Sequence, residues 1–439
     1  METIVQIAQL VLALSILVGI HEAGHMFAAK YFGMKVEKFF IGFPPKIFGF
    51  KRGETEYGLG AIPLGGFVKI SGMMDESMDK EAMAQEPKPW EFRSKPAWQR
   101  LIVMLGGIIV NVAAGIIAFV VLTYSNGETY WSSDIIKEHG VVAGELAQEV
   151  GFQTGDKVIK LNGEDFVEER NIWGGDLLLE SNSSWTIDRN GEIIEIAVPR
   201  GFINNLNDEE FELNFLQHRI PFEIGLFSEN SSFEAAGVLV GDQITKIGDV
   251  DVEYFDQVKT AISPFAGQTV QVELLRNGNE TISLSAPVNA DTTLGFFIRP
   301  LLEPSNRQYA FGEAVVRGTG QAFSSVILNA KAMGKMFTGE VSARSMSGPI
   351  GIVNFFPKTW DWDRFLYILG FLSMILAFMN LLPIPALDGG HVMFLLYELI
   401  SGKAPSDKFL ENAQKVGMVM ILGLMVFVLG NDILKLFGI

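Results

Sequence analysis

The chain has 439 residues, of which 48% are hydrophobic and 19% charged, and its formal net charge is −17. A chain of this length suits two or three structural units rather than one. It contains no cysteine, which excludes disulfides and thiol chemistry. Acidic side chains gather in the middle of the sequence, and an acidic surface argues against nucleic acid as a partner.

Four apolar stretches are long enough to cross a bilayer, which takes about 20 residues of helix. We expect them within residues 1–31, 98–124, 363–400 and 416–439. The third stretch is interrupted by Asn380, Pro383 and Pro385, so its helix should end early. Buried core helices, or a signal peptide for the first stretch, are the alternative interpretations.

The distribution of lysine and arginine predicts on which side of the membrane each connecting segment lies. Residues 32–97 and 401–415 are rich in these side chains, which predicts two cytoplasmic loops. The long segment between the second and third stretches is then translocated, and both termini lie outside. Arg317, Lys331, Lys335 and Arg344 argue the other way, but long segments cross largely regardless of charge. Residues 306–362 form a linker, in which residues 311–337 suit either an interfacial helix or a packing element.

The translocated segment contains an internal duplication. Residues 150–161 match residues 236–247, each copy having a glycine turn, Gly-Asp and an alternating strand. Residues 185–192 and 272–279 are matched hairpins, each with an Asn-Gly turn.

The duplicated unit resembles the PDZ domain, which implies one such domain in residues 125–220 and another in residues 221–305. PDZ domains bind an extended peptide at a sheet edge, and Ile224 and Gly225 stand where they place the carboxylate-binding loop. An alternative of equal weight is that the two domains act as a spacer or as a steric gate and bind no peptide.

The first apolar stretch contains the sequence His21-Glu22-Ala23-Gly24-His25. Residues four apart share one face of a helix, so both imidazoles can reach one zinc ion. Glu22 can then take a proton from water activated at that ion. Ionisable residues are costly inside a membrane and indicate function there.

Two histidines leave a zinc site short of a third protein ligand. The candidates are Asp388, His391, Glu398, His139 and His218. Asp388 is the best choice because glycines follow it and two prolines precede it, which lets the backbone approach a cavity. His391 is second.

These motifs resemble the site-2 proteases, intramembrane zinc metalloproteases. The matching residues are 21–25 and 380–389, and the resemblance covers nearly the whole chain. It implies that His21, His25 and Asp388 bind Zn²⁺, that Glu22 is the catalytic acid and base, and that Asn380 helps to hold substrate. Pro383 belongs to the same motif. The family group with tandem PDZ domains acts in the bacterial inner membrane on single-span proteins such as anti-sigma factors, and on remnant signal peptides.

A short apolar stretch rich in glycine, residues 58–70, is too broken to span a membrane. In the family this region resembles a membrane-dipping β-hairpin or sheet, and we expect its edge to capture an unwound substrate strand through Gly58, Gly60 and Leu64. A plain loop is the alternative.

The sequence thus predicts a polytopic α-helical membrane protein with four transmembrane helices, a membrane-associated β-hairpin or sheet, and two tandem PDZ domains of α+β type. We expect it to act as a monomer in contact with membrane lipid, with the active site near the cytoplasmic side. Rival hypotheses are a membrane-tethered PDZ adaptor with a vestigial metal site, and an ion or zinc transporter. No inverted repeat among the spans supports the transporter.

Overall fold

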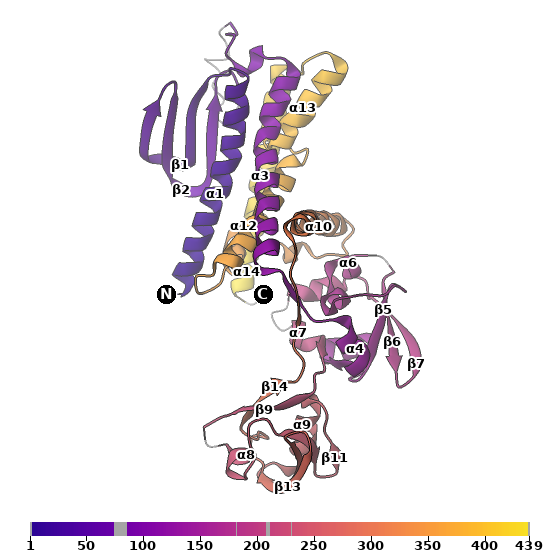
Figure 1. Cartoon of the computed structure of the whole chain (residues 1–439). Helices are drawn as coiled ribbons and strands as arrows, with labels where there is room; N and C mark the ends of the chain where they lie inside the picture. Colours follow the sequence, from indigo (N-terminus) through magenta and orange to yellow (C-terminus); the bar gives the residue numbers. More distant parts are fainter. Residues whose placement is uncertain (1, 74–85, 181, 208–210, 230, 438–439) are drawn as a thin grey trace. The chain divides into compact units, whose positions relative to one another are not determined.

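The computed structural model describes residues 2–73, 86–180, 182–207, 211–229 and 231–437. The chain divides into two compact units (Figure 1). Unit 1 comprises residues 1–127 and 308–439, and unit 2 comprises residues 128–307.

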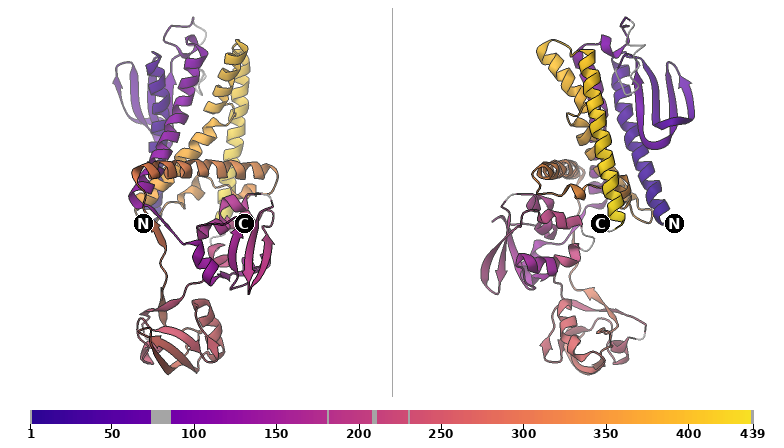
Figure 2. Two further views of the ribbon diagram at one scale, coloured as in Figure 1. Left: turned by 45° about the vertical axis from the view of Figure 1, so that its right-hand side comes forward. Right: turned by 180° about the vertical axis from the view of Figure 1, so that it is seen from behind.

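Unit 1 is a helical bundle. Four of its helices are long and apolar enough to cross a membrane, which confirms the four predicted stretches. They are α1 (Glu2–Tyr31), α3 (Ala97–Asn126), α12 (Trp362–Leu381) and α14 (Asp407–Leu436). The described residues of this unit also form η1 (Phe92–Ser94), α10 (Phe311–Phe337), η5 (Ala343–Ser345), α11 (Pro349–Val353) and α13 (Asp388–Ser401). Helix α10 runs across the bundle (Figure 2).

Helices α1 and α3 cross closely because glycines meet at the crossing. A Cβ added to Gly24 would lie 2.3 Å from the carbonyl oxygen of Gly106, and one added to Gly106 would lie 2.6 Å from that of Gly24. Small residues allow such close approach between membrane helices, whose association the hydrophobic effect does not drive. The two backbones are therefore in direct contact beside the histidines of α1.

The predicted strand after α1 is confirmed and is longer than expected. Strands β1 (Val36–Arg52) and β2 (Thr55–Ile70) pair with each other. Both strands fold over, so that Phe40 lies opposite Gly58 and also opposite Phe67. Among the described residues, no further strand pairs with this sheet, and the last part of β2 forms one outer edge.

Unit 2 contains two repeats of the same arrangement. The first has β4 (Val141–Ala143), α5 (Glu145–Val150), β5 (Lys157–Leu161), β6 (Ser184–Arg189), β7 (Glu192–Ala197) and β8 (Leu216–His218). The second has β9 (Phe222–Phe227), α8 (Ser232–Ala235), β10 (Gln243–Ile247), β12 (Thr269–Arg276), β13 (Glu280–Pro287) and β14 (Phe296–Pro300). In each repeat the central hairpin pairs with the strand after the Gly-Asp turn, as β5-β6-β7 and β10-β12-β13, while the first strand pairs with the last, as β4-β8 and β9-β14.

The other elements of unit 2 surround these sheets. They are β3 (Glu128–Tyr130), α4 (Ser133–His139), η2 (Glu169–Trp173), α6 (Gly175–Leu178), η3 (Phe202–Asn207), α7 (Phe211–Asn214), β11 (Val250–Asp251), α9 (Phe255–Ile262), η4 (Ser263–Phe265) and β15 (Ser305–Arg307). Each repeat has its own apolar core, centred on Trp185 in the first and on Phe233 in the second. The Asn-Gly turns have positive φ at both residues, 53° and 90° at Asn190 and Gly191, as hairpin turns require.

Candidate metal centre

Three side chains from two distant parts of unit 1 converge on one point. The Nε2 atoms of His21 and His25, both on α1, lie 3.2 Å apart. The Oδ2 atom of Asp388, in the first turn of α13, lies 3.1 Å from the first and 3.3 Å from the second. Both imidazoles are buried. The structure thus brings together the two histidines of α1 and Asp388, the third ligand that the sequence favoured.

Helix α3 fixes both imidazole rings from behind. His25 Nδ1 lies 2.8 Å from the carbonyl oxygen of Val103, which can only accept, so Nδ1 carries the proton and Nε2 presents a lone pair. His21 Nδ1 lies 3.1 Å from the side-chain amide of Asn111. The Oδ1 atom of that buried amide has no other partner, and turning the amide lets Oδ1 accept from His21 Nδ1. Both Nε2 atoms then face Asp388 as acceptors.

This arrangement fits a cation. The Oδ2 atom of Asp388 is buried and receives no hydrogen bond. The candidate ligand atoms of these three side chains thus all lie within 4.8 Å of one another. Two imidazole nitrogens and one carboxylate oxygen, with a position left for water, are a ligand set typical of catalytic zinc.

The space for these rings comes from Gly107 of α3. A Cβ added there would lie 2.6 Å from Cε1 of His21 and 2.6 Å from Nε2 of His25. Sequence reasoning missed Gly106, Gly107 and Asn111. The available signal was a pair of glycines and a polar amide within an otherwise apolar stretch.

A cavity of about 490 Å³ adjoins the three side chains. Glu22 lines it, and its carboxylate accepts a hydrogen bond from the backbone of Val68 in β2. The opposite wall is the outer edge of the sheet, residues 66–70. One cavity therefore contains the candidate metal site, a carboxylate outside the ligand set, and an open strand edge.

The last turn of α12 and the loop before α13 carry two further predicted residues, Asn380 and Pro383. The side-chain nitrogen of Asn380 lies 3.3 Å from Nε2 of His21. Pro383 lies in the loop that follows. The loop turns tightly, since a Cβ on Gly389 would lie 2.2 Å from the carbonyl oxygen of Leu382. The glycines after Asp388 are thus required for the close approach that the sequence suggested.

The alternative third ligands lie outside the cluster, and three of them have other partners. Glu398 forms an ion pair with Arg100, and His391 lies one turn beyond Asp388 outside the three-residue cluster. His139 hydrogen-bonds to Tyr254, and His218 to Glu169, both within unit 2.

The remaining predicted residues lie in strands. Gly58 and Gly60 are in β2, where a Cβ on Gly60 would meet the carbonyl oxygen of Phe43 at 2.3 Å. Both glycines therefore serve close pairing of β1 with β2. Leu64 is also in β2, but its side chain is outside the described residues.

Ile224 and Gly225 lie in β9 of unit 2. The Ile224 side chain is fully buried, its N–H donates to the carbonyl oxygen of Asp242, and its own carbonyl accepts from Gly241. Both backbone groups of Ile224 are thus engaged inside the repeat.

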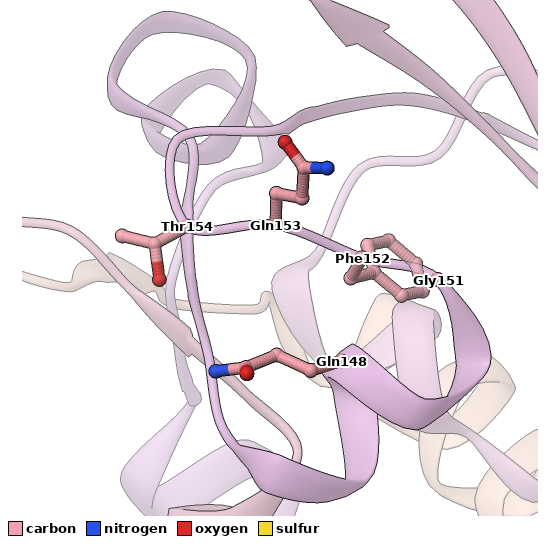
Figure 3. Close-up of a pocket in the computed structure, with 5 residues that line it drawn as sticks. All are labelled: Gln148, Gly151, Phe152, Gln153 and Thr154. Carbon is pink, nitrogen blue, oxygen red and sulfur yellow. The ribbon is translucent and has the colours of Figure 1, made fainter.

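A second hollow, of about 360 Å³, lies at the turn between α5 and β5 of the first repeat (Figure 3). Its lining includes Gln148, Gln153 and Thr154 together with Gly151 and Phe152. No metal-binding group of side chains was found among the described residues of unit 2.

Comparison with known proteins agrees with this chemistry. Residues 9–424 match Peptidase family M50. The chain is 28% identical to the Regulator of sigma E protease of Haemophilus influenzae, over 97% of this chain and 98% of that protein. It is 29% identical to a putative zinc metalloprotease of Vibrio cholerae, over 97% and 98%. It is 28% identical to the zinc metalloprotease RasP of Shouchella clausii, over 97% of each.

Proposed function

Because the chain belongs to peptidase family M50, the site-2 proteases, we propose that it cuts peptide bonds within membrane-spanning segments of single-span proteins. The chain is a zinc metalloendopeptidase with four apolar helices. The observation that carries the proposal is the shared cavity, in which Glu22 and the cluster of His21, His25 and Asp388 face the outer edge of β2.

The proposed roles follow from the geometry. His21, His25 and Asp388 would hold the zinc ion, which would supply Lewis acidity at the scissile carbonyl. Glu22 lies beside them without belonging to the cluster, so it is the group that can accept a proton from the attacking water. It then returns that proton to the leaving amine.

A helical substrate must be unwound before its carbonyls are accessible, because they are hydrogen-bonded within the helix. The outer edge of β2 lies beside Glu22, pairs with no further strand among the described residues, and can bind an extended strand by β-addition. Asn380, next to His21, and the Pro383 loop would hold the strand from the other side. Gly58, Gly60 and Leu64 contribute by shaping β2.

The outer repeats are proposed to be PDZ domains that limit access to the site. Full engagement of the Ile224 backbone favours a gate over carboxylate binding at Ile224 and Gly225. The resemblance to the Haemophilus protein supports an anti-sigma factor as substrate, with remnant signal peptides as a second class. The expected location is the bacterial inner membrane, with both termini and the repeats in the periplasm and the protein acting as a monomer.

Cleavage of a single-span model substrate by the purified protein in detergent tests this function. Wild-type protein should cut the substrate, and both Glu22→Gln and a zinc chelator should abolish cleavage. Because Glu22 is outside the ligand cluster, Glu22→Gln should retain zinc, measured by metal analysis. Equal cleavage by the Glu22→Gln protein would refute the catalytic assignment.

Strand addition is tested with substrate peptides. N-methylation at alternate residues removes ladder donors without altering the enzyme. Methylation of the residues whose N–H groups face β2 should raise KM strongly, whereas methylation of the intervening residues, whose N–H groups face away, should not. Equal cleavage of both peptides would contradict binding at the edge of β2.

A further inference from the structure

One face of α3 contacts the other elements that build the metal centre. Arg100, Val103, Gly107 and Asn111 are three, four and four residues apart, which places them on one side of a helix. Val103 and Asn111 form hydrogen bonds with the two histidines of α1, and Gly107 leaves space for the imidazole rings. These three residues fix α1 relative to α3.

Arg100 makes the corresponding contact with α13. Its Nη2 atom lies 2.5 Å from Oε1 of Glu398, in a charge-assisted hydrogen bond. The two side chains are only 15% and 18% exposed. The Arg100 Nε–H also donates to the carbonyl oxygen of Lys95 at 2.9 Å, and the guanidinium lies 5.9 Å from the centre of the Phe92 ring. These two contacts, with residues just ahead of α3 in the chain, therefore orient the guanidinium independently of Glu398.

Apolar side chains also join α13 to this region. Val392 and Leu395 pack in one cluster with Val103 and Met104 of α3. Apolar contacts between helices in a bilayer lack a hydrophobic driving force and leave the axial position weakly determined. A helix rises about 1.5 Å per residue, so a slip of one residue is large compared with contacts of about 3 Å. A directional ion pair resists such a slip.

We infer that Arg100 and Glu398 are a positioning pair that holds α13 in register with α3 and so keeps Asp388 within reach of His21 and His25. Neither Arg100 nor Glu398 is among the residues that line the cavity, so the pair acts through Asp388, ten residues before Glu398 on the same helix. This inference depends on the proposed role of Asp388 as a zinc ligand.

Zinc affinity of the full-length protein in detergent tests the pair. Arg100→Gln and Glu398→Gln should each weaken zinc binding by about 10- to 100-fold, as loss of supporting groups does elsewhere. The exchanged variant, Arg100→Glu with Glu398→Arg, should recover most of the affinity. The visible spectrum of the cobalt-substituted protein should change in the single variants and return towards wild type in the exchanged one.

Arg93→Gln is the matched control. Arg93 pairs with Glu91 at 2.7 Å with similar exposure, 18% and 11%, but these two residues belong to one segment of the chain, so this pair does not join two helices. Its zinc affinity should equal that of wild type. Wild-type affinity and spectrum in Arg100→Gln would overturn the inference, and so would failure of the exchanged, folded variant to recover. Asp388→Asn separates the two proposals: if it binds zinc normally, the ligand assignment fails, whatever the pair does.

Discussion

In unit 2 the buried carboxylates of Asp156 and Asp242 are each held by an arginine, whereas in unit 1 the buried Oδ2 atom of Asp388 receives no hydrogen bond. The two unit 2 sites are copies of one another: Nη2 of Arg189 lies 2.7 Å from Asp156, and Nη2 of Arg276 lies 2.7 Å from Asp242.

The copies agree in further detail. Each arginine also donates to a glycine carbonyl, and each aspartate also accepts a backbone N–H, from Gln153 in the first repeat and Leu239 in the second. A buried charge whose hydrogen bonds are all made stabilises a fold, whereas converging electron-pair donors are suited to bind a cation. The difference separates the two structural Asp–Arg sites from the candidate metal centre within one chain.

The largest effect should follow from a methyl group between α3 and the histidines. In Gly107→Ala the new Cβ would lie 2.6 Å from both imidazoles, so the rings must move and the cluster cannot form. We expect peptidase activity to fall by at least about 100-fold, since small misplacements have costs of this size. Cleavage of the single-span substrate measures it, and unit 2 should stay intact.

Gly423→Ala is the control, because a Cβ there meets nothing within 4 Å. If Gly107→Ala cuts as fast as Gly423→Ala, the close packing of α3 on the histidines is not needed for catalysis.

The converse change removes a satisfied charge. Asp242→Asn leaves Arg276 without its partner and should destabilise the second repeat by about 2 kcal/mol, less than a fully buried pair because part of Arg276 is exposed. Hydrogen exchange of the β12 and β13 amides measures this loss. Activity on a short peptide and zinc content should not change.

Asp251→Asn, at an exposed position, should have no effect on exchange. Asp156→Asn should reproduce the effect in the first repeat, on β6 and β7. A loss of zinc in either unit 2 variant would contradict the separation between the two kinds of site.

How well the sequence predicted each feature depends on how far apart along the chain its residues lie. The spacing of His21 and His25 and the Asn-Gly turns are local, and the structure contains both as expected. The roles of Gly107 and Asn111 depend on where α3 crosses α1, which no local pattern encodes. The Asp–Arg pairs were also missed, although the duplication had aligned both partners in each copy.

The sheet formed by β1 and β2 likewise combines a local feature that the sequence predicted with a tertiary feature that it did not. A short apolar run rich in glycine, together with the family resemblance, predicted the strand in residues 58–70, but pairing of Phe40 with two parts of β2 depends on irregular register along β1. Likewise, the prolines predicted the break after α12, while the separate helix α13 and its contact with Arg100 required the tertiary structure.

A smaller effect is expected from the amide that orients His21. Asn111→Ala should weaken zinc binding by about tenfold, because the imidazole loses the partner that selects its tautomer. Zinc titration with a competing chelator measures it. Ser373 is a suitable control: its hydroxyl donates to the backbone carbonyl of Asn111, so Ser373→Ala leaves the amide in place. Equal affinities in the two variants would show that the amide does not orient the ligand.

The smallest effect concerns pH. Burial raises the pKa of Asp242, but hydrogen bonds from Arg276 and the Leu239 N–H outweigh it and hold the pKa below its ordinary value. The unfolded chain then binds the proton more readily, so the pair stabilises the second repeat fully above about pH 5. That contribution is lost progressively as the pH falls through about 4 towards the lower pKa of the folded state.

Exchange protection of β12, corrected for intrinsic rates, should therefore decline on acidification in wild type. It should decline less in Asp242→Asn, which has no carboxylate to protonate. Parallel declines in the two proteins would show that other groups govern the acid response of this repeat.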